Sequence, residues 1–434
     1  MANDGLADSV IRAHQATWID EAVFLAFLLL AFVGLTPFAV PPQTLNPMAS
    51  GLNTTGAGDL ARQICYLVVF AAIVLGAFRN RGLRALSSVP ILLVLLLAWC
   101  VLSATWAGEP GVAVRRAGLA VILVASIMLS VETIGAERSL ALWRWVLVGV
   151  LIVNFVSIPL IPQARHLPGE ADPSLVGDWR GLYDHKNIAG SVTAMTTIIF
   201  LFTPHLSSGL FRKLRDWTIV AAAIAFTVMT RSKSSLGLMV IALAMGAVYR
   251  WAWKRELDRT IVVVAGLILV VVVTAFLVAD QGAIARFFEN PDDLTGRTAI
   301  WQAEIAYIHD HPLFGAGFGT FADTGGLSPL HNYVGNGWVS EVSHGHNGYL
   351  QLLVTVGAIG FVLAIASLIV APAIVFWERD GDLDMKALLF ALFVFLVLHN
   401  FMESDFFEGD GVTWVGFLLM LAMLYSPGRR GEVQ

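Results

Sequence analysis

The stretch HGHNGYLQLLVTVGAIGF at residues 344–361, continued by VLAIASLIVAPAIVFW up to Trp377, decides the fold class. A short polar segment with two histidines is followed at once by an apolar run that contains no Lys, Arg, Asp or Glu. About 20 such residues suffice to cross a bilayer as a helix. The stretch therefore predicts a membrane helix, over 355–377, that directly follows a polar loop.

The rest of the chain has the same character. Of its 434 residues 57% are apolar and only 14% are charged, and the mean hydropathy is +0.73. Soluble domains carry about 25% charged residues. The apolar runs are continuous rather than alternating, which excludes a membrane β-barrel. We therefore predict an all-α fold, a polytopic transmembrane bundle of about twelve helices. The expected spans are 22–40, 60–78, 89–105, 116–132, 141–160, 188–204, 217–230, 235–251, 261–279, 355–377, 386–401 and 411–425.

Three regions follow from these spans. Residues 1–279 hold about nine membrane helices, residues 280–354 form a large outer loop, and residues 355–434 hold about three more helices. The loop contains large apolar side chains, among them Trp301 and Phe318, so we expect it to fold over the membrane with short helices of its own. The glycines of GAGFGTF at 315–321 are expected to allow tight turns.

The distribution of basic residues predicts the orientation. With both termini in the cytoplasm, 17 of the 27 Lys and Arg residues lie on the inner side. Cytoplasmic loops carry an excess of these residues, so the orientation with both termini in the cytoplasm is preferred. The acidic residues before the first apolar run, such as Asp4 and Asp8, give no sign of a cleaved signal peptide. We expect a multi-pass protein of the inner-membrane type, with the long loop on the outer side.

Ten cations remain on the outer side, against this bias: Arg62, Arg115, Arg116, Arg165, Arg180, Lys186, Arg231, Lys233, Arg286 and Arg297. Several lie at predicted membrane edges, where burying a charge costs a few kcal/mol. They either extend to lipid headgroups or bind an anionic substrate at the outer membrane surface. The second interpretation explains the whole group at once.

Two of the cationic segments suit an anion. RGLYDHKNIAG at 180–190 places Arg180, His185 and Lys186 at the start of a helix, where free backbone N–H groups attract negative charge. The alternative is that Asn187 merely caps this helix at the membrane interface. In MTRSKSSL at 229–236, two cations and three serines fill a tight turn, and such donors suit phosphate oxygens better than an ordinary turn does.

GRTAIW at 296–301 begins an amphipathic helix. Arg297 lies in its first turn, where the helix dipole disfavours a cation, and this indicates either a binding role or a surface salt bridge with Asp292 or Asp293. The apolar positions that recur at helical spacing are Ile300, Ile305 and Ile308.

SHGHNGYLQ at 343–351 offers a general base. The pKa of histidine lies near the working pH, so we predict that His346 removes a proton, although it could instead cap the helix or hydrogen-bond within the loop. Glu403, on the same outer side, could orient a histidine or an arginine, or merely pair with one. We expect no metal, because no third ligand of suitable spacing joins His344 and His346.

These segments together resemble the O-antigen ligase and polysaccharide polymerase superfamily of bacterial membrane glycosyltransferases. The resemblance runs from about residue 111 to 403 and is strongest over 296–363, in GRxxxW and HNGYLxxLxxxGxxGF. The segment WRGLYDHKN and the Ser-Lys-Ser turn look closer to exopolysaccharide polymerases of the succinoglycan type than to lipopolysaccharide ligases.

The resemblance implies a metal-independent, inverting transfer without a cofactor, from a glycan on undecaprenyl diphosphate to a hydroxyl of another glycan. By the family pattern His346 is the catalytic histidine and Arg297 binds the diphosphate. A second essential arginine usually lies in the turn between helices. Here Lys233 occupies its place, with Arg231 two residues earlier, and Lys lacks the bidentate fork of Arg. The remaining residues expected at the substrate are Lys186, His185, Arg180, Asn347, Tyr349 and Glu403.

The acceptor separates the leading functions. A repeat-unit polymerase extends another lipid-linked glycan, whereas an O-antigen ligase transfers the glycan to lipid A-core in lipopolysaccharide synthesis. A chain-length regulator is a further partner of such polymerases, and no nucleic acid is expected. A transporter or flippase of the same lipid is disfavoured, because the polar residues gather on one face and no internal repeat is visible. The loop has eight acidic residues against two arginines, which favours a neutral or sparsely charged glycan: Asp280, Glu289, Asp292, Asp293, Glu304, Asp310, Asp323 and Glu341.

Overall fold

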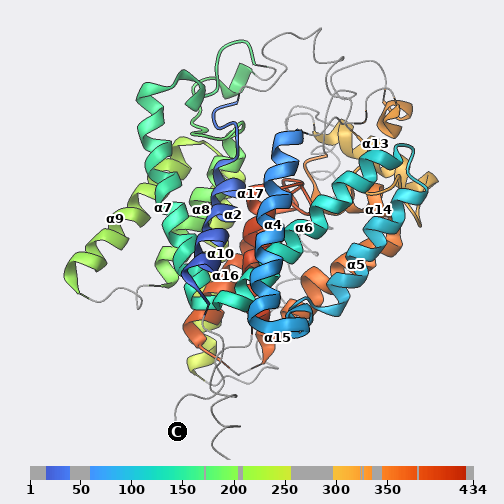
Figure 1. Cartoon of the computed structure of the whole chain (residues 1–434). Helices are drawn as coiled ribbons and strands as arrows, with labels where there is room; N and C mark the ends of the chain where they lie inside the picture. The colour runs from blue at the N-terminus through green and yellow to red at the C-terminus, as the bar shows by residue number, and fades with distance from the viewer. Residues whose placement is uncertain are drawn as a thin grey trace, which may run out of the picture.

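The computed structural model describes residues 16–39, 59–170, 173–203, 209–255, 297–322, 324, 327–334, 345–378 and 381–426. These residues form helices that lie along one another in a bundle, and no β-strand occurs among them (Figure 1). The predicted all-α class is confirmed.

Eleven of the twelve predicted spans coincide with helices. They are α2 (Trp18–Val33), α4 (Leu60–Arg81), α5 (Ile91–Leu102), α6 (Pro110–Ile134), α7 (Ala136–Leu160), α8 (Lys186–Phe202), α9 (Leu210–Met229), α10 (Lys233–Lys254), α14 (Gly348–Ala364) with η10 (Ile365–Val370) and α15 (Ala371–Trp377), α16 (Leu383–His399) and α17 (Val412–Tyr425). The twelfth predicted span, 261–279, lies outside the described residues, as do 280–296 and 335–344 of the predicted outer loop. The total number of spans and the three-region division therefore stay predictions.

Within the described ranges, five helical stretches are long and apolar enough to cross a membrane: Leu60–Ser88, Pro110–Ile134, Ala136–Leu160, Lys233–Lys254 and Gly348–Trp377. The outside of the bundle carries large exposed apolar side chains such as Leu75 and Phe211. In water so much exposed apolar surface would be unfavourable, whereas lipid covers it without penalty. The chain is a membrane protein.

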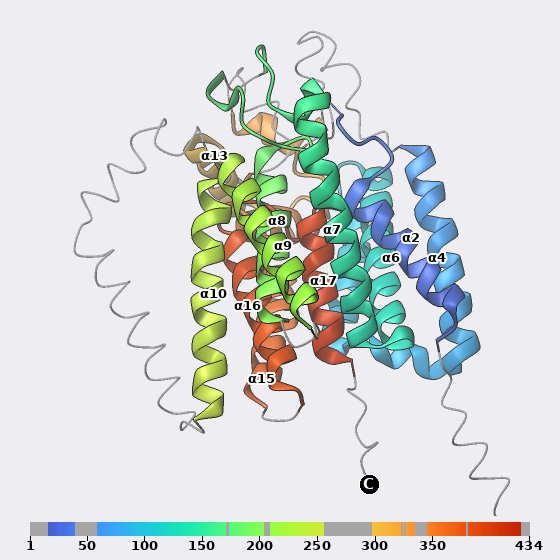
Figure 2. The same ribbon diagram turned by 90° about the vertical axis from the view of Figure 1, so that its left-hand side faces the viewer.

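The centre of the bundle is formed by helices that are buried on nearly every side. Residues Val412 to Met423 of α17 are all buried, and α8 is buried almost throughout its length. A helix with no polar face packs on all sides, and Figures 1 and 2 show α17 and α8 surrounded by their neighbours. This rigid centre supports the loops at the end of the bundle where α13 lies.

A kink in α14 receives the glycine-rich loop. At Gly357 the backbone has a φ of 66°, and the carbonyl of Leu313 lies against its Cα, so no side chain fits there. The amides of Ala316 and Gly317 donate to carbonyls of α14 at 2.8 and 2.9 Å. Gly315, Gly317 and Gly319 all have positive φ, as the predicted tight turns require. The loop thereby fixes α13 (Arg297–Asp310) beside α14.

The helix predicted from GRTAIW begins at Arg297, but its predicted apolar face is partly wrong. Ile300 is buried as expected, whereas Ile305 is 57% exposed. The buried face continues instead through Ala303, Glu304 and Tyr307. Residues three, four and seven positions after Ile300 share its side of a helix, and the fifth does not. A carboxylate therefore occupies a position where the apolar pattern would place a hydrocarbon side chain.

Candidate active site

His346, Glu403 and Arg297 meet at one end of the bundle, from three separate segments. Nδ1 of His346 lies 2.8 Å from Oε2 of Glu403. Nη2 of Arg297 donates to Oε1 of the same carboxylate at 2.9 Å, and Nη1 donates to the carbonyl of Met402 at 2.6 Å. One cluster therefore contains the predicted base His346, the predicted phosphate-binding residue Arg297, and Glu403, which was predicted to pair with a histidine or an arginine. The proposed pairing of Arg297 with Asp292 or Asp293 lies outside the described residues.

Glu403 is the centre of this cluster. Its Oε1 also accepts a hydrogen bond of 2.6 Å from the side chain of Asn187, on the first turn of α8. Burial alone would raise the pKa of Glu403, but the hydrogen bond from His346 and the charge of Arg297 hold that pKa well below its usual range. The carboxylate is therefore ionised at any physiological pH and can fix the orientation of the imidazole.

The backbone around His346 is held by the segment that carries Glu403. His346 has a φ of 52°, a conformation that non-glycine residues rarely adopt. The amide of Asn347 donates to Oγ of Ser404 at 3.0 Å, and that of Gly348 lies 2.8 Å from the carbonyl of Asn400. Asn347 also caps α14, so this helix begins seven residues before the predicted span. These bonds compensate the unfavourable φ and place the imidazole beside Glu403.

A second cluster contains two of the other predicted cations. Asp178 is almost fully buried and accepts from Nζ of Lys186 at 2.6 Å and from Nη1 of Arg231 at 3.2 Å. The side chain of Arg231 is otherwise 73% exposed, so its remaining N–H groups face outward. Asn187, which follows Lys186 in the chain, contacts Glu403. The two clusters are therefore neighbours.

Lys233 begins α10 two residues after Arg231, and its side chain is exposed. The N-cap of α10 is Ser232, whose hydroxyl accepts from the amide of Ser235. Ser235 in turn lies 3.5 Å from Nε2 of His399, and Nδ1 of His399 lies 2.6 Å from Asp405. The turn thus has a buried hydroxyl network beneath two outward-facing cations.

His185 and Arg180 have structural partners. His185, rather than Asn187, caps α8, because its Nδ1 accepts from the amide of Asn187 at 3.2 Å. Burial lowers the pKa of His185 to about 4, so the ring is neutral and able to accept. The interpretation of Asn187 as the cap is wrong. Arg180 is fully buried, forms an ion pair with Glu170 at 3.1 Å, and donates to the carbonyl of Gln163 at 2.8 Å.

Tyr349 packs below the cluster. Its ring contacts Phe401, and its hydroxyl donates to the carbonyl of Val397 at 2.8 Å. The structure therefore brings Arg297, His346, Glu403, Lys186 and Arg231 to one region, whereas it ties the polar ends of Arg180 and Tyr349 to the protein backbone.

Several residues of this region were not singled out from the sequence. Asp178, which joins Lys186 to Arg231, and the pair His399–Asp405 have no local pattern that reveals them. Glu304 could have been found, because it lies seven positions after Arg297 and hence on the same side of α13.

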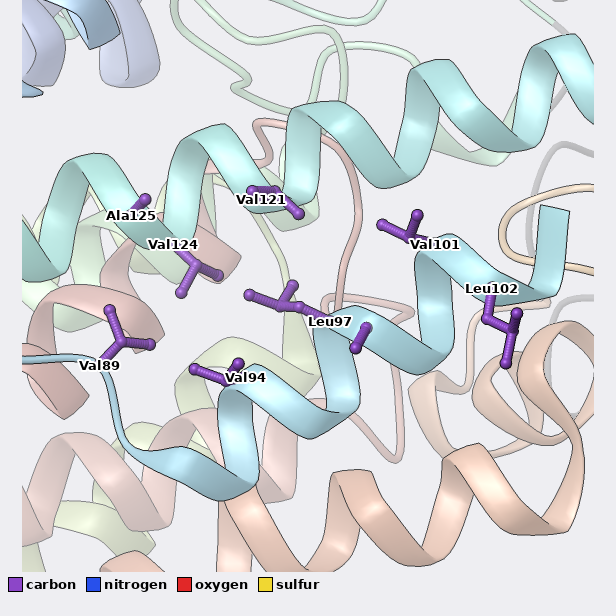
Figure 3. Close-up of a pocket in the computed structure, with 9 residues that line it drawn as sticks. Val89, Val94, Leu97, Val101, Leu102, Val121, Val124 and Ala125 are labelled. Carbon is purple, nitrogen blue, oxygen red and sulfur yellow. The ribbon is translucent and has the colours of Figure 1, made fainter. Parts of the chain in front are cut away.

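An apolar groove of about 550 Å³ lies between α5 and α6, and none of the residues that line it belongs to the charged clusters (Figure 3). Val94, Leu97 and Val101 line it from α5, and Val121 and Val124 from α6. A diphosphate or a sugar would find no polar partner in this groove, so it suits only hydrocarbon.

The comparisons with known proteins agree with this geometry. Residues 218–365 match the family model described as O-Antigen ligase. This range contains Arg231, Lys233, Arg297 and His346. None of the curated proteins matches the chain. The match supports the resemblance seen in the sequence: residues 218–365 are similar to the O-antigen ligase family.

Proposed function

We propose that this protein transfers a glycan from undecaprenyl diphosphate to a hydroxyl of another glycan, most directly as a repeat-unit polymerase. The observation that carries the proposal is the cluster in which one buried carboxylate, Glu403, binds both His346 and Arg297. The family that residues 218–365 resemble is a family of membrane glycosyltransferase-like enzymes. The identity of the donor and of the acceptor belongs to the proposal.

The histidine is arranged as a general base. Glu403 is ionised and accepts from Nδ1 of His346, which fixes the neutral tautomer that carries its proton on Nδ1. In this tautomer Nε2 carries the lone pair that takes the proton of the acceptor hydroxyl. Such proton transfer contributes about 10²–10⁴-fold to a rate. Glu403 stabilises the imidazolium that results, as a carboxylate does in other His–carboxylate pairs.

The reaction is a single displacement. The acceptor oxygen attacks C1 of the donor sugar from the face opposite the diphosphate, and the C1–O bond to phosphorus breaks with its electron pair on the leaving group. The configuration at C1 is inverted. The leaving undecaprenyl diphosphate gains negative charge, and cations fixed beforehand in a site of low dielectric stabilise that charge.

Arg297 is the main candidate for this stabilisation. Its hydrogen bonds use two of its N–H donors, to Glu403 and to Met402, and a guanidinium has five. Lys186 and the exposed side of Arg231 lie in the neighbouring cluster and extend the positive region. Lys233, at the N-terminus of α10, is a further candidate on the same turn. Together they provide a diphosphate with contacts at several oxygens.

We place the cluster at the periplasmic face of the bacterial inner membrane, with both termini in the cytoplasm, from the distribution of basic residues in the chain. There the lipid tail of the donor stays in the bilayer while its diphosphate reaches the cations. A second candidate function is O-antigen ligation to lipid A-core, because the matching family model is described as O-Antigen ligase.

The test is a reaction of the purified full-length protein with an undecaprenyl-diphosphate-linked repeat unit as the only glycan. A ladder of longer lipid-linked products is expected. If product forms only after lipid A-core is added, the protein is a ligase. If no product forms with either acceptor, the protein is not a transferase, and a transporter of the same lipid becomes the favoured function. EDTA is expected to leave the rate unchanged, and a loss that Zn²⁺ or Mg²⁺ restores would overturn the metal-independent mechanism.

A further inference from the structure

Glu304 is a buried carboxylic acid without a hydrogen-bonding partner. It is 0% exposed, and within the described part of the chain neither of its carboxyl oxygens has a donor or acceptor in reach. Leaving such a group unsatisfied in the interior is unfavourable by about 1–3 kcal/mol or more. An apolar side chain of the same size would pack this face of α13 at no such cost. A retained, unsatisfied group indicates a role other than packing.

The position of Glu304 connects it to the candidate active site. On the same face of α13, Arg297 contacts Glu403, and Nε1 of Trp301 donates to the carbonyl of Gly345 at 2.7 Å. One turn further, the carboxyl group of Glu304 lies against Cα of Gly345, so closely that any side chain at position 345 would collide with it. Gly345 immediately precedes His346. Trp301 and Glu304 thus contact Gly345, the residue before the proposed base, and Arg297 is connected to that base through Glu403.

Arg297, Trp301 and Glu304 form a row along α13, with Arg297 at one end and Glu304 at the other. Seven residues of helix span about 10 Å, the distance from Arg297 to Glu304 along the axis. Arg297 is at the end where the other cations, Lys186 and Arg231, adjoin through Asn187 and Glu403. Within the described part of the chain no cation forms an ion pair with Glu304, and this end of the row is suited to a neutral group. In the proposed reaction, the neutral group is the sugar hydroxyl of the acceptor.

The chemistry of Glu304 fits a sugar hydroxyl. Burial raises the pKa of Glu304 to about 8, so its carboxyl group is protonated at neutral pH. A protonated carboxyl both donates and accepts a hydrogen bond, and so does a hydroxyl. Because the protonated carboxyl group is neutral, it neither attracts a cation nor repels an anion. It selects for a ligand with hydroxyl groups.

We propose that Glu304 is a binding residue for the acceptor glycan and hydrogen-bonds a hydroxyl of the acceptor sugar next to His346. This inference rests on the proposed function. Glu304 is covered in the present structure, so the acceptor has to move the segment at Gly345 or a neighbouring side chain as it binds. Side-chain movements of this kind are common at binding surfaces, and the lack of a side chain at Gly345 facilitates them.

The experiment varies the acceptor independently of the donor. The lipid-linked repeat unit serves as donor at saturating concentration, and the repeat unit released from its lipid serves as a soluble acceptor. For Glu304→Leu we expect the half-saturating acceptor concentration to rise roughly tenfold, the value of one lost hydrogen bond. Binding of undecaprenyl diphosphate should be unchanged. Glu304→Gln, whose amide still donates and accepts, should show a rise within about threefold.

A stability measurement separates binding from packing. Glu304→Leu removes an unsatisfied polar group, so its melting temperature should rise by a few degrees while acceptor binding weakens. Asp310→Asn, at the exposed end of the same helix, is the matched control and should change neither quantity. An unchanged acceptor dependence in Glu304→Leu would overturn the proposal, as would a fall in melting temperature together with weaker donor binding.

Failure of the proposed function gives a different result. If the unaltered protein forms no product with any acceptor, the transferase is contradicted, and Glu304 is tested by equilibrium binding of the labelled soluble repeat unit. Weaker binding by Glu304→Leu than by the unaltered protein would support the glycan contact. Equal binding, or no binding by either protein, would overturn it.

Discussion

Glu403 and Glu304 are both buried glutamates beside the segment of His346, and they have opposite surroundings. Glu403 accepts hydrogen bonds from Asn187, Arg297 and His346, and its pKa is held well below the usual range. Glu304 has no such partner among the described residues, and its pKa is raised to about 8. Both carboxyl groups are largely shielded from water, although 12% of the Glu403 side chain is exposed, so the neighbouring donors decide whether each carboxyl group is charged. The charged one is suited to orient a base and a cation, and the neutral one to bind a hydroxyl.

Replacing each glutamate by leucine should give the largest contrast. Glu403→Leu leaves Arg297, whose side chain is only 14% exposed, without its carboxylate partner, and it removes the group that orients His346. We expect both transfer activity and melting temperature to fall strongly, whereas Glu304→Leu should melt higher. Activity of the purified variants and their thermal unfolding measure this. Equal behaviour of the two variants would refute the comparison.

His346→Ala should abolish transfer while leaving the protein folded. The side chain is 27% exposed, so its loss disturbs packing little, but about 10²–10⁴-fold of the rate depends on a general base. Glycan polymer and protein level in cells, followed by in vitro turnover, check this result. Normal polymer in cells that produce the variant would show that the carboxylate of Glu403 orients something other than a base.

Arg297→Lys should be impaired by about 10–100-fold, because lysine keeps the charge but loses the planar fork. In the structure this fork bonds to Glu403 and to the carbonyl of Met402 simultaneously. The measurement is turnover with saturating donor, compared with Arg231→Lys, whose single bond to Asp178 a lysine could replace. Near-normal turnover of Arg297→Lys would mean that positive charge alone is sufficient at this position.

The pH dependence of stability has opposite signs for the two acids. The pKa of Glu304 is raised to about 8 from about 4.3 when unfolded. The native state therefore keeps a proton that the unfolded chain loses, and stability falls as pH rises from about 5 to about 8. Glu403, with a lowered pKa, loses its contribution only as the pH falls below about 4.

Melting temperatures between pH 5 and pH 9 measure this slope. The unaltered protein should become less stable up to about pH 8, and Glu304→Leu should lack that part of the slope. The absence of any difference between the two slopes would show that Glu304 is not protonated in the native state.

The outcome at individual residues shows how far prediction from the sequence reaches. The start of α13 at Arg297, the grouping of His346 with Glu403 on one side, and the tight turns at Gly315 and Gly317 were predictable from local patterns. The covering of Glu304 was not predicted, because a carboxylate is normally expected on the exposed side of a helix and only packing buried it, although helical spacing places it beside Ile300. For the same reason Arg180 looked like a free cation, although Glu170 and the carbonyl of Gln163 bind it.

The sequence alone determined that this protein is a bundle of apolar helices with its polar chemistry at one end, because helical length, periodicity and turn residues are local properties. The tertiary structure alone decided which charges are paired. Glu403 meets His346 across 57 residues and Asn187 across 216, and Lys186 meets Arg231 only through Asp178. Contacts of this kind depend on how helices pack, and packing is set by the whole chain rather than by any segment of it.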